Sequence, residues 1–150
     1  MTRLIVLDST PVGMLCHPNP RGAALDCIKW LRELLANGHR IVLPEVVDYE
    51  VRRELRRARR GNAIRNLDDL AIRVEYLRLD TPQIRLAAEL WARVRQLGLP
   101  TAGPDSLDAD AILGAQALSL NDPTVVVATS NPGHLTRFVN AELWQNIPTI

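Results

Sequence analysis

The sequence predicts an α/β fold in which a mostly parallel sheet is covered by helices on both faces. Short apolar runs rich in β-branched residues, such as RLIVLDST at residues 3–10, alternate with longer segments whose apolar residues recur every three to four positions. Runs that are apolar at nearly every position are typical of strands buried on both faces, as in parallel sheets. Because the two patterns alternate along the chain, they favour an α/β arrangement over separate α and β regions.

The boundaries of the expected elements follow from turn and capping residues. Strands are expected over residues 3–10, 39–44, 73–80 and 123–131, and helices over residues 20–37, 45–60, 62–71, 81–98 and 106–118. Gly38 and Gly61 are natural C-terminal stops for the first two helices. Thr81 followed by Pro82 is typical of an N-cap with proline at the first helical position. The tail from residue 143 is expected to add a short edge strand.

Length and composition limit the class of protein. The 150 residues, 47% of them apolar, can bury a sizeable core, so residues 1–150 are expected to form one domain. The net charge of +1 means that charge-driven binding must come from a local patch. No signal-peptide pattern and no apolar stretch of about 20 residues is present, which predicts a cytoplasmic protein with no membrane association. The spacing of Cys16 and Cys27, with only His17 nearby, argues against a zinc site.

Two polar side chains are expected at the same edge of the sheet. Asp8 ends the first strand and is followed by Ser9 and Thr10, and Asn131 ends the strand within PTVVVATSN. The carboxyl ends of parallel strands meet at one edge, where α/β sheets bind their ligands. Asp8 and Asn131, although far apart in the sequence, are therefore predicted to lie close together.

Two further acids lie on helices at positions that can reach this edge. On the second long helix, Glu50 flanks the apolar stripe, whereas Glu45 and Asp48 are expected to point toward solvent. Asp110 flanks the apolar face of the helix in SLDADAILGAQAL, and Asp108 lies about 160° away from it around an ideal helix. Asp110 is therefore expected to face the site. Asp108 complements the helix dipole after a cap at Asp105 or Ser106.

Convergence of these oxygen ligands predicts a divalent metal site. Carboxylates brought together raise one another's pKa unless a cation lies among them, and hard oxygen ligands favour Mg²⁺ or Mn²⁺. Each residue also has an ordinary structural interpretation. Asp8 can be a loop acid, Glu50 a surface residue paired with Arg53 or Arg57, Asp110 a helix-dipole partner, and Asn131 a turn residue before a proline. Only their joint placement favours a shared site.

Four segments together resemble the PIN-domain nucleases. LIVLDST resembles the family's opening strand with its terminal acid, and LPEVVDYEVRREL resembles the second motif, whose glutamate falls on Glu50. DADAILGAQAL resembles the third motif, with Asp110 in the place of the acid, and VVVATSNPGHLTRF resembles the last. The motifs run from Asp8 to Phe138 in the family's order. The length is similar to that of VapC-type toxins of toxin–antitoxin pairs.

The resemblance implies a three-layer α/β/α sandwich and a ribonuclease that depends on Mg²⁺ or Mn²⁺. Asp8, Glu50 and Asp110 would form the acidic core, with Asp108 as a further metal ligand if the helix begins late. Asn131 replaces the commoner aspartate at the fourth position and supplies an uncharged oxygen. The hydroxyls of Thr129 and Ser9 would support the site, and cleavage would leave a 5′-phosphate and a 3′-hydroxyl. The family also implies a homodimer and a cognate antitoxin that places a peptide, often with an arginine, near the acids.

An arginine-rich segment, VRRELRRARR at residues 51–60, is a candidate RNA contact. Arg52, Arg56, Arg59 and Arg60 are expected opposite the apolar stripe, and Arg53 lies beside Glu50. Arginine forks suit phosphate groups, so this segment is a candidate ridge for the RNA backbone. A solvated helix face and a surface for an acidic partner are the alternatives.

Other functional classes fit the sequence less well. A phosphate-accepting response regulator needs a lysine after a late strand, but the only lysine is Lys29 in the first helix. A haloacid-dehalogenase-type phosphatase needs Asp-x-Asp after its first strand, and Asp8-Ser9-Thr10 lacks the second acid. A non-catalytic PIN-like domain that binds RNA or protein, and a nuclease acting on DNA, remain as alternatives.

Overall fold

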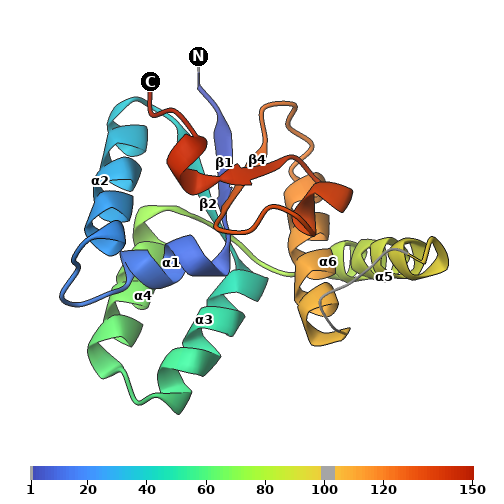
Figure 1. Ribbon diagram of the computed structural model, residues 1–150, viewed down its shortest axis with the longest axis horizontal. Coiled ribbons are helices and arrows are strands. Elements are labelled where there is room, and N and C mark those ends of the chain that lie inside the picture. Colours follow the sequence, from blue (N-terminus) through green and yellow to red (C-terminus); the bar gives the residue numbers. More distant parts are fainter. Residues whose placement is uncertain (1, 99–103) are drawn as a thin grey trace.

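The computed structural model describes residues 2–98 and 104–150, which build a five-stranded parallel sheet between two layers of helices (Figure 1). The strand order is β3-β2-β1-β4-β5, and each neighbouring pair is parallel. The strands are β1 (Leu4–Leu7), β2 (Arg40–Pro44), β3 (Glu75–Leu77), β4 (Val126–Thr129) and β5 (Ala141–Leu143). The predicted α/β/α sandwich with its parallel sheet is confirmed.

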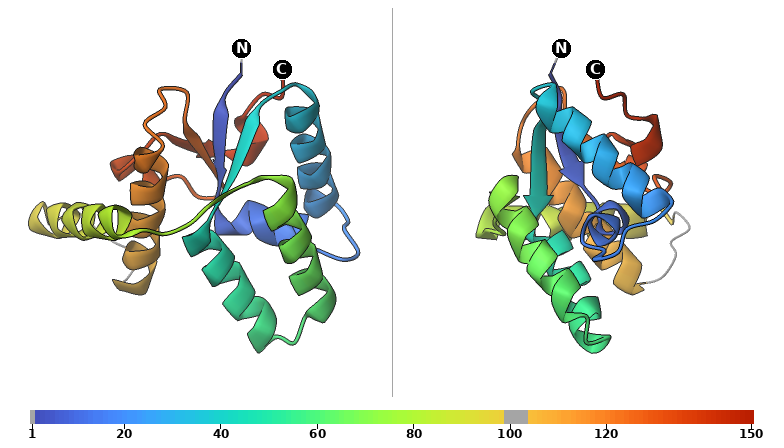
Figure 2. Two further views of the ribbon diagram at one scale, coloured as in Figure 1. Left: turned by 180° about the vertical axis from the view of Figure 1, so that it is seen from behind. Right: turned by 90° about the vertical axis from the view of Figure 1, so that its left-hand side faces the viewer.

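The helices divide between the two faces as right-handed crossovers require. The helices are α1 (Ser9–Leu15), α2 (Ala23–Ala36), α3 (Glu45–Arg57), α4 (Gly61–Arg73), α5 (Thr81–Gln96) and α6 (Pro104–Ser119). From β1 the chain moves outward through β2 to β3, and helices α1 to α4 form these connections. It then returns past β1 to β4, and α5 and α6 form this connection. Because the direction across the sheet is reversed, the right-handed crossover covers the opposite face. Accordingly, α2 and α6 lie on opposite sides of the sheet, and α5 projects from the body beside α6 (Figures 1 and 2).

The central strands form the core. All four residues of β1 and all four of β4 are buried, which matches their nearly continuous apolar sequences. Helix α6 is also buried on most of its surface, because consecutive residues from Leu113 to Ala117 are inaccessible. The carboxylates of this helix are therefore carried on an element that packs firmly against its neighbours.

Several local boundaries differ from those that the sequence predicts. The short helix α1 follows β1 without a loop and was not predicted, because its seven residues are too few to show a helical repeat. Gly61 begins α4 and does not end α3, and the left-handed residue after α3 is Arg59 with φ 56°. Asp80, and not Thr81, caps α5 through a capping box with Gln83. The predicted edge strand begins two residues early, at Ala141, and from Trp144 the chain forms a 3₁₀ turn, η2 (Trp144–Asn146).

Trp30 and the two cysteines belong to the packed core. Trp30 meets Trp144 edge to face with ring centroids 5.5 Å apart, and its indole N–H donates to the carbonyl of Ile147. Cys16 and Cys27 are buried free thiols, and burial raises the pKa of each to about 12. Within the described ranges, no helix combines the length and hydropathy of a membrane-spanning segment.

Candidate active site

Asp8 is fixed where the order of the strands reverses. It follows β1 directly and caps α1, with one carboxylate oxygen accepting from the amide of Ser9 at 2.7 Å. The other oxygen accepts from the hydroxyl of Thr129 at 2.7 Å. Thr129 ends β4, the neighbour of β1, and is 1% exposed. Asp8 therefore lies in the crevice between two strands whose connections run to opposite faces, the usual ligand position in such sheets.

Glu50 reaches the same region from α3. One of its carboxylate oxygens accepts a hydrogen bond from the hydroxyl of Ser9 at 3.0 Å. The pKa of Glu50 is raised mainly by burial and further by repulsion from Asp8, while the Ser9 hydrogen bond and the guanidinium of Arg53 lower it. Ser9 therefore links the two acids, because its amide binds Asp8 and its hydroxyl binds Glu50.

Asp110 completes the group from the opposite layer. It is half-buried on α6, and burial together with the charges of Asp8 and Glu50 raises its pKa to about 6. The mutual effects show that carboxylates from the end of β1, from α3 and from α6 share one electrostatic environment. That Asp8, Glu50 and Asp110 together form one site stays a prediction.

The donor set fits a hard divalent cation. It consists of carboxylate and hydroxyl oxygens, which are the ligands of Mg²⁺ and Mn²⁺. Among the residues described, no three His, Cys, Asp or Glu side chains are close enough to form a finished metal cage.

Comparison with known proteins places the chain in a family. The sequence matches the PIN domain over residues 19–136. The chain belongs to the PIN-domain family. The matched region contains Glu50, Asp110 and Asn131 and begins after Asp8, so the first acid is placed by the structure and not by the family match. No curated protein matches the sequence at a significant level.

Solved structures share the fold at low sequence identity. VapBC2 from Rickettsia felis, bound to a promoter DNA fragment, matches with a TM-score of 0.70 and 18% identity, over 94% of this chain and 98% of the other. VapBC-1 from nontypeable Haemophilus influenzae matches with a TM-score of 0.65 and 20% identity, over 95% and 99%. FitAcB from Neisseria gonorrhoeae matches with a TM-score of 0.61 and 19% identity, over 95% and 99%. At this identity the likeness supports the fold of the PIN domain alone.

Asn131 and Asp108 lie at the margin of the acidic group. Asn131 is exposed, and its backbone N–H donates to the hydroxyl of Thr129 at 3.1 Å. Thr129 therefore contacts both Asp8 and Asn131, the residue at the fourth motif position. Helix α6 begins at Pro104, four residues before Asp108, so the late helix start that would bring Asp108 beside Asp110 is not observed. Asp108 is exposed and lines the pocket that extends from Glu50 toward α6. The caps expected at Asp105 or Ser106 lie outside the described side chains.

Two pockets flank Glu50 along α3. One, of about 370 Å³, extends toward α1 and is lined by Ser9, Thr10 and Gly13 together with Glu50 and Arg53. The other, of about 400 Å³, extends toward α6, and its lining includes Tyr49, Glu50, Arg53 and Asp108. Glu50 and Arg53 line both, so Glu50 of this PIN domain borders a pocket on either side.

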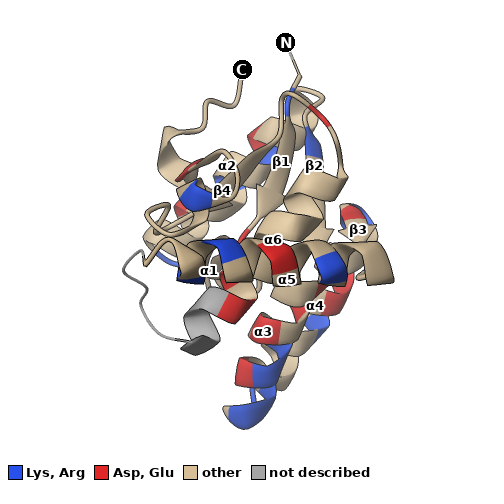
Figure 3. Cartoon of the chain, turned by 90° about the vertical axis from the view of Figure 1, so that its right-hand side faces the viewer, with Lys and Arg blue, Asp and Glu red and all other residues tan. Residues whose placement is uncertain are grey.

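The arginines of α3 do not form the single helical ridge that the sequence predicts. The helix ends at Arg57, so Arg59 and Arg60 lie beyond it, and both are exposed, as Arg56 is. Figure 3 shows Lys and Arg gathered at the far end of α3. Arg52 is turned inward and pairs with Asp48 on its own helix at 2.9 Å and with Asp68 of α4 at 2.8 Å.

Two acids that were expected in solvent are structural. Asp48 is 9% exposed and accepts from the hydroxyl of Tyr76 at 2.6 Å, in addition to its pair with Arg52. Glu45 accepts from the amide of Leu79 at 2.9 Å. The prediction that both point to solvent is wrong, because α4 and β3 cover the face of α3 that an isolated helix would leave open. This burial is the reason that Glu50, and not Asp48, is the acid of α3 available at the groove.

Tyr49 is a residue of the site that the sequence patterns did not indicate. It is 60% exposed, and the guanidinium of Arg53 lies 5.1 Å from the centre of its ring. The sequence did contain a signal for it. Tyr49 is next to Glu50 and four residues before Arg53, and residues four apart share a helix face.

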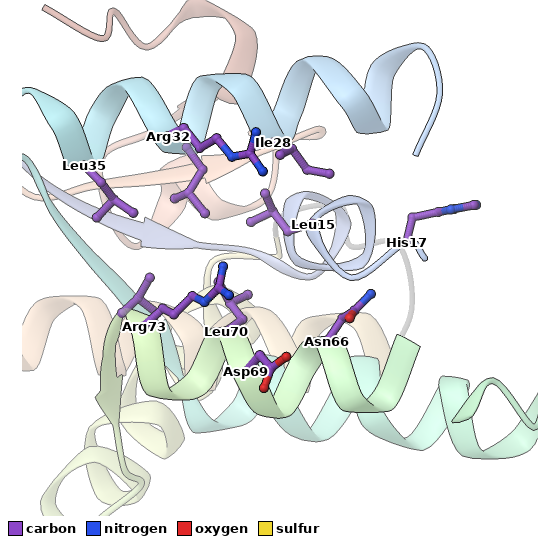
Figure 4. A pocket seen from close by; sticks show the side chains of 11 residues that line it. Leu15, His17, Ile28, Arg32, Leu35, Asn66, Asp69, Leu70 and Arg73 are labelled. Atoms are coloured by element: carbon purple, nitrogen blue, oxygen red, sulfur yellow. The ribbon is translucent and has the colours of Figure 1, made fainter. Parts of the chain in front are cut away.

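A further pocket lies away from the acids, between α2 and α4. It has a volume of about 260 Å³ and an apolar floor that includes Leu31 and Leu70. Arg32 from α2 and Arg73 from α4 extend over it from opposite sides (Figure 4). None of the predicted site residues lines this pocket, so it is not part of the acid site.

Proposed function

We propose that this PIN domain is an Mg²⁺- or Mn²⁺-dependent endoribonuclease that hydrolyses phosphodiester bonds of single-stranded RNA and acts as a toxin. The observation that carries the proposal is the hydrogen-bonded group that Asp8, Ser9, Glu50 and Thr129 form at the strand-reversal edge of the sheet. Burial and the charges of Asp8 and Glu50 raise the pKa of the third acid, Asp110. Three carboxylates are costly to hold together unless they bind a cation, and nucleases of this family supply the matching chemistry.

Asp8, Asp110 and Glu50 would hold the metal ion. Asn131 offers an uncharged oxygen at the fourth position. When bound, Mg²⁺ or Mn²⁺ neutralises charge on the scissile phosphate and lowers the pKa of water. The protein contributes orientation, because Thr129 and the Ser9 amide fix both oxygens of Asp8.

Glu50 is the proposed proton acceptor. Burial and the charge of Asp8 raise its pKa, which makes its carboxylate a better base at neutral pH, and the Ser9 hydroxyl holds one of its oxygens. The oxygen of a water molecule bonds to phosphorus as the P–O3′ bond breaks, the proton of the water passes to Glu50, and the 3′ oxygen leaves as a hydroxyl after taking up a proton. The products are a 5′-phosphate and a 3′-hydroxyl.

The test is the Asp8→Asn variant assayed on single-stranded RNA with Mg²⁺. Asparagine caps helices as well as aspartate does, so the fold should persist while cleavage falls about a hundredfold or more. Asp26→Asn, an exposed acid on α2, is the matched control and should cleave normally. Wild-type rates in Asp8→Asn would refute the assigned role, and faster cleavage of single-stranded DNA would identify a DNA-directed nuclease.

A cognate antitoxin is the proposed protein partner. The structures with the same fold include VapBC complexes, and one of them is bound to promoter DNA. A partner peptide carrying an arginine near the acids would offset their repulsion and occlude the groove. Expression of the wild-type chain should then arrest growth, expression of Asp8→Asn should not, and the antitoxin should restore growth.

A non-catalytic PIN domain that binds RNA or protein is the second candidate. It is favoured by Asn131, which leaves the fourth motif position uncharged and exposed. Titration with Mn²⁺ separates the two functions, because an adaptor has no need of the ion, whereas the nuclease should bind it with release of protons from the coupled acids.

A further inference from the structure

The pocket between α3 and α6 has the composition of a site for a flat, partly polar ligand. Its walls are apolar, formed by Val46 and Leu79 on one side and Ala109 and Ile112 on the other. Its volume of about 400 Å³ lies within the range of roughly 300–1,000 Å³ that is typical of small-ligand sites. Glu50 lines the same pocket, so a group bound there is next to this candidate catalytic acid.

The pocket also presents an aromatic ring and a cation at its mouth. Tyr49 is 60% exposed, which is unusual for an aromatic side chain in a protein with only six of them. The guanidinium of Arg53 lies over its ring, 5.1 Å from the centre, so the two side chains form a stacked pair. Arginine planes and tyrosine rings are the surfaces on which proteins stack unpaired bases.

The charges around the pocket suit a nucleotide. Arg53 is exposed and lines the groove on both sides of Glu50, where it can contact a backbone phosphate without leaving the ring. Asp108 is exposed at the pocket and carries only acceptor oxygens, which can receive a hydrogen bond from an exocyclic amino group of a base.

We propose that this pocket is a nucleobase subsite, in which one unpaired base of the RNA next to the scissile phosphate stacks against the Tyr49–Arg53 pair. The inference rests on the proposed ribonuclease function and extends it. A base in a duplex is already stacked and cannot enter, so the subsite selects single-stranded RNA. Asp108 favours bases that present an amino group.

The experiment uses the full chain and a short single-stranded RNA of mixed sequence that carries a fluorescent base analogue. Binding is measured with a chelator present, so that no cleavage occurs, and cleavage is measured separately with Mg²⁺. The variants are Tyr49→Phe, which keeps the ring, and Tyr49→Leu, which keeps the apolar bulk but removes the stacking surface. Arg65→Gln, which changes an exposed arginine of α4 that does not line the pocket, is the control for general charge.

Wild type, Tyr49→Phe and Arg65→Gln should quench the fluorescent base and prefer single strands over the matching duplex. Tyr49→Leu should bind about tenfold more weakly, lose the quenching and raise the KM of cleavage with little change in kcat. Equal affinity, quenching and KM in Tyr49→Leu and wild type would overturn the subsite while leaving the nuclease intact. Failure of the wild type to cleave any RNA with Mg²⁺ would instead reject the proposed function and the subsite with it.

Discussion

Asp110 makes the stability of the metal-free protein depend on pH. Its pKa is about 6 in the folded protein and near 3.8 in the unfolded chain. Between these values the folded state binds more protons than the unfolded state, so stability falls as pH rises through this window. The cost of the charged form is then fully present at neutral pH. A divalent ion that binds the carboxylate removes this cost.

We therefore predict that Asp110→Asn has a higher Tm than wild type at pH 7 in the presence of a chelator, and that the difference shrinks near pH 4. Added Mg²⁺ should raise the Tm of wild type more than that of Asp110→Asn, because the ion stabilises the ionised carboxylate. Thermal unfolding with and without Mg²⁺ measures both effects. If wild type and the variant respond equally to Mg²⁺, Asp110 is not a ligand.

At the scale of single residues, the sequence identifies side chains near strand ends better than side chains on helices. Asp8 and Thr129 are placed by strand geometry alone, since both end central strands. Asp48 was misjudged because its burial depends on Tyr76, which comes from another element, β3. A helical wheel contains no information about which outer face a later segment will cover.

The close packing of helix α6 against the C-terminal segment depends on one glycine, Gly114. A Cβ added at Gly114 would lie 2.8 Å from Cβ of Phe138, closer than such atoms approach. Cβ of Phe138 is attached directly to the backbone, so the clash cannot be relieved by rotating a side chain. The small residues of DADAILGAQAL therefore let the strand-end loop after β4 approach the helix that carries Asp110.

We predict that Gly114→Ala destabilises the protein by roughly 1–3 kcal/mol, although alanine is the better helix former by about 1 kcal/mol. Gly13→Ala in α1 is the matched control. Its added Cβ meets nothing within 4 Å, so this variant should be neutral or more stable by about 0.5–1 kcal/mol. Urea unfolding of both variants provides the measurement. Equal stability of Gly114→Ala and wild type would show that Phe138 shifts freely.

At the scale of elements, long periodic segments were predictable and short ones were not. The helices α2, α3 and α5 have enough turns for their apolar stripe to show in the sequence, whereas α1 has only seven residues. Helix α1 exists because Asp8 caps it and because Val12 is buried beneath it. The predicted arginine ridge is interrupted for a related reason. Helix α3 ends at Arg57, so Arg59 and Arg60 are not part of the helix.

At the scale of the whole molecule, the fold follows from the alternation of strands and helices together with the handedness of the crossovers. Chain order alone leaves open where the strand sequence reverses. That reversal, between β1 and β4, brings Asp8 beside Thr129 and lets α6 deliver Asp110 to the same edge. The four-motif resemblance supplied this information at the sequence level, and the pattern of apolar residues did not.

The projecting α5–α6 arm is where the predicted homodimer should form. Ile84 of α5 is 45% exposed beside a pocket of about 350 Å³, which is lined almost wholly by apolar residues, among them Ala87, Trp91 and Ile112. An exposed apolar patch of this kind favours a partner, and a second copy can use the same patch on both subunits around a twofold axis.

We predict that light scattering shows a dimer for the wild type and a monomer for Ile84→Lys. The control, Ile72→Lys, changes an 84% exposed isoleucine of α4 that does not line this pocket, and it should remain dimeric. A monomeric wild type, or an Ile84→Lys variant that stays dimeric, would remove α5 from the interface.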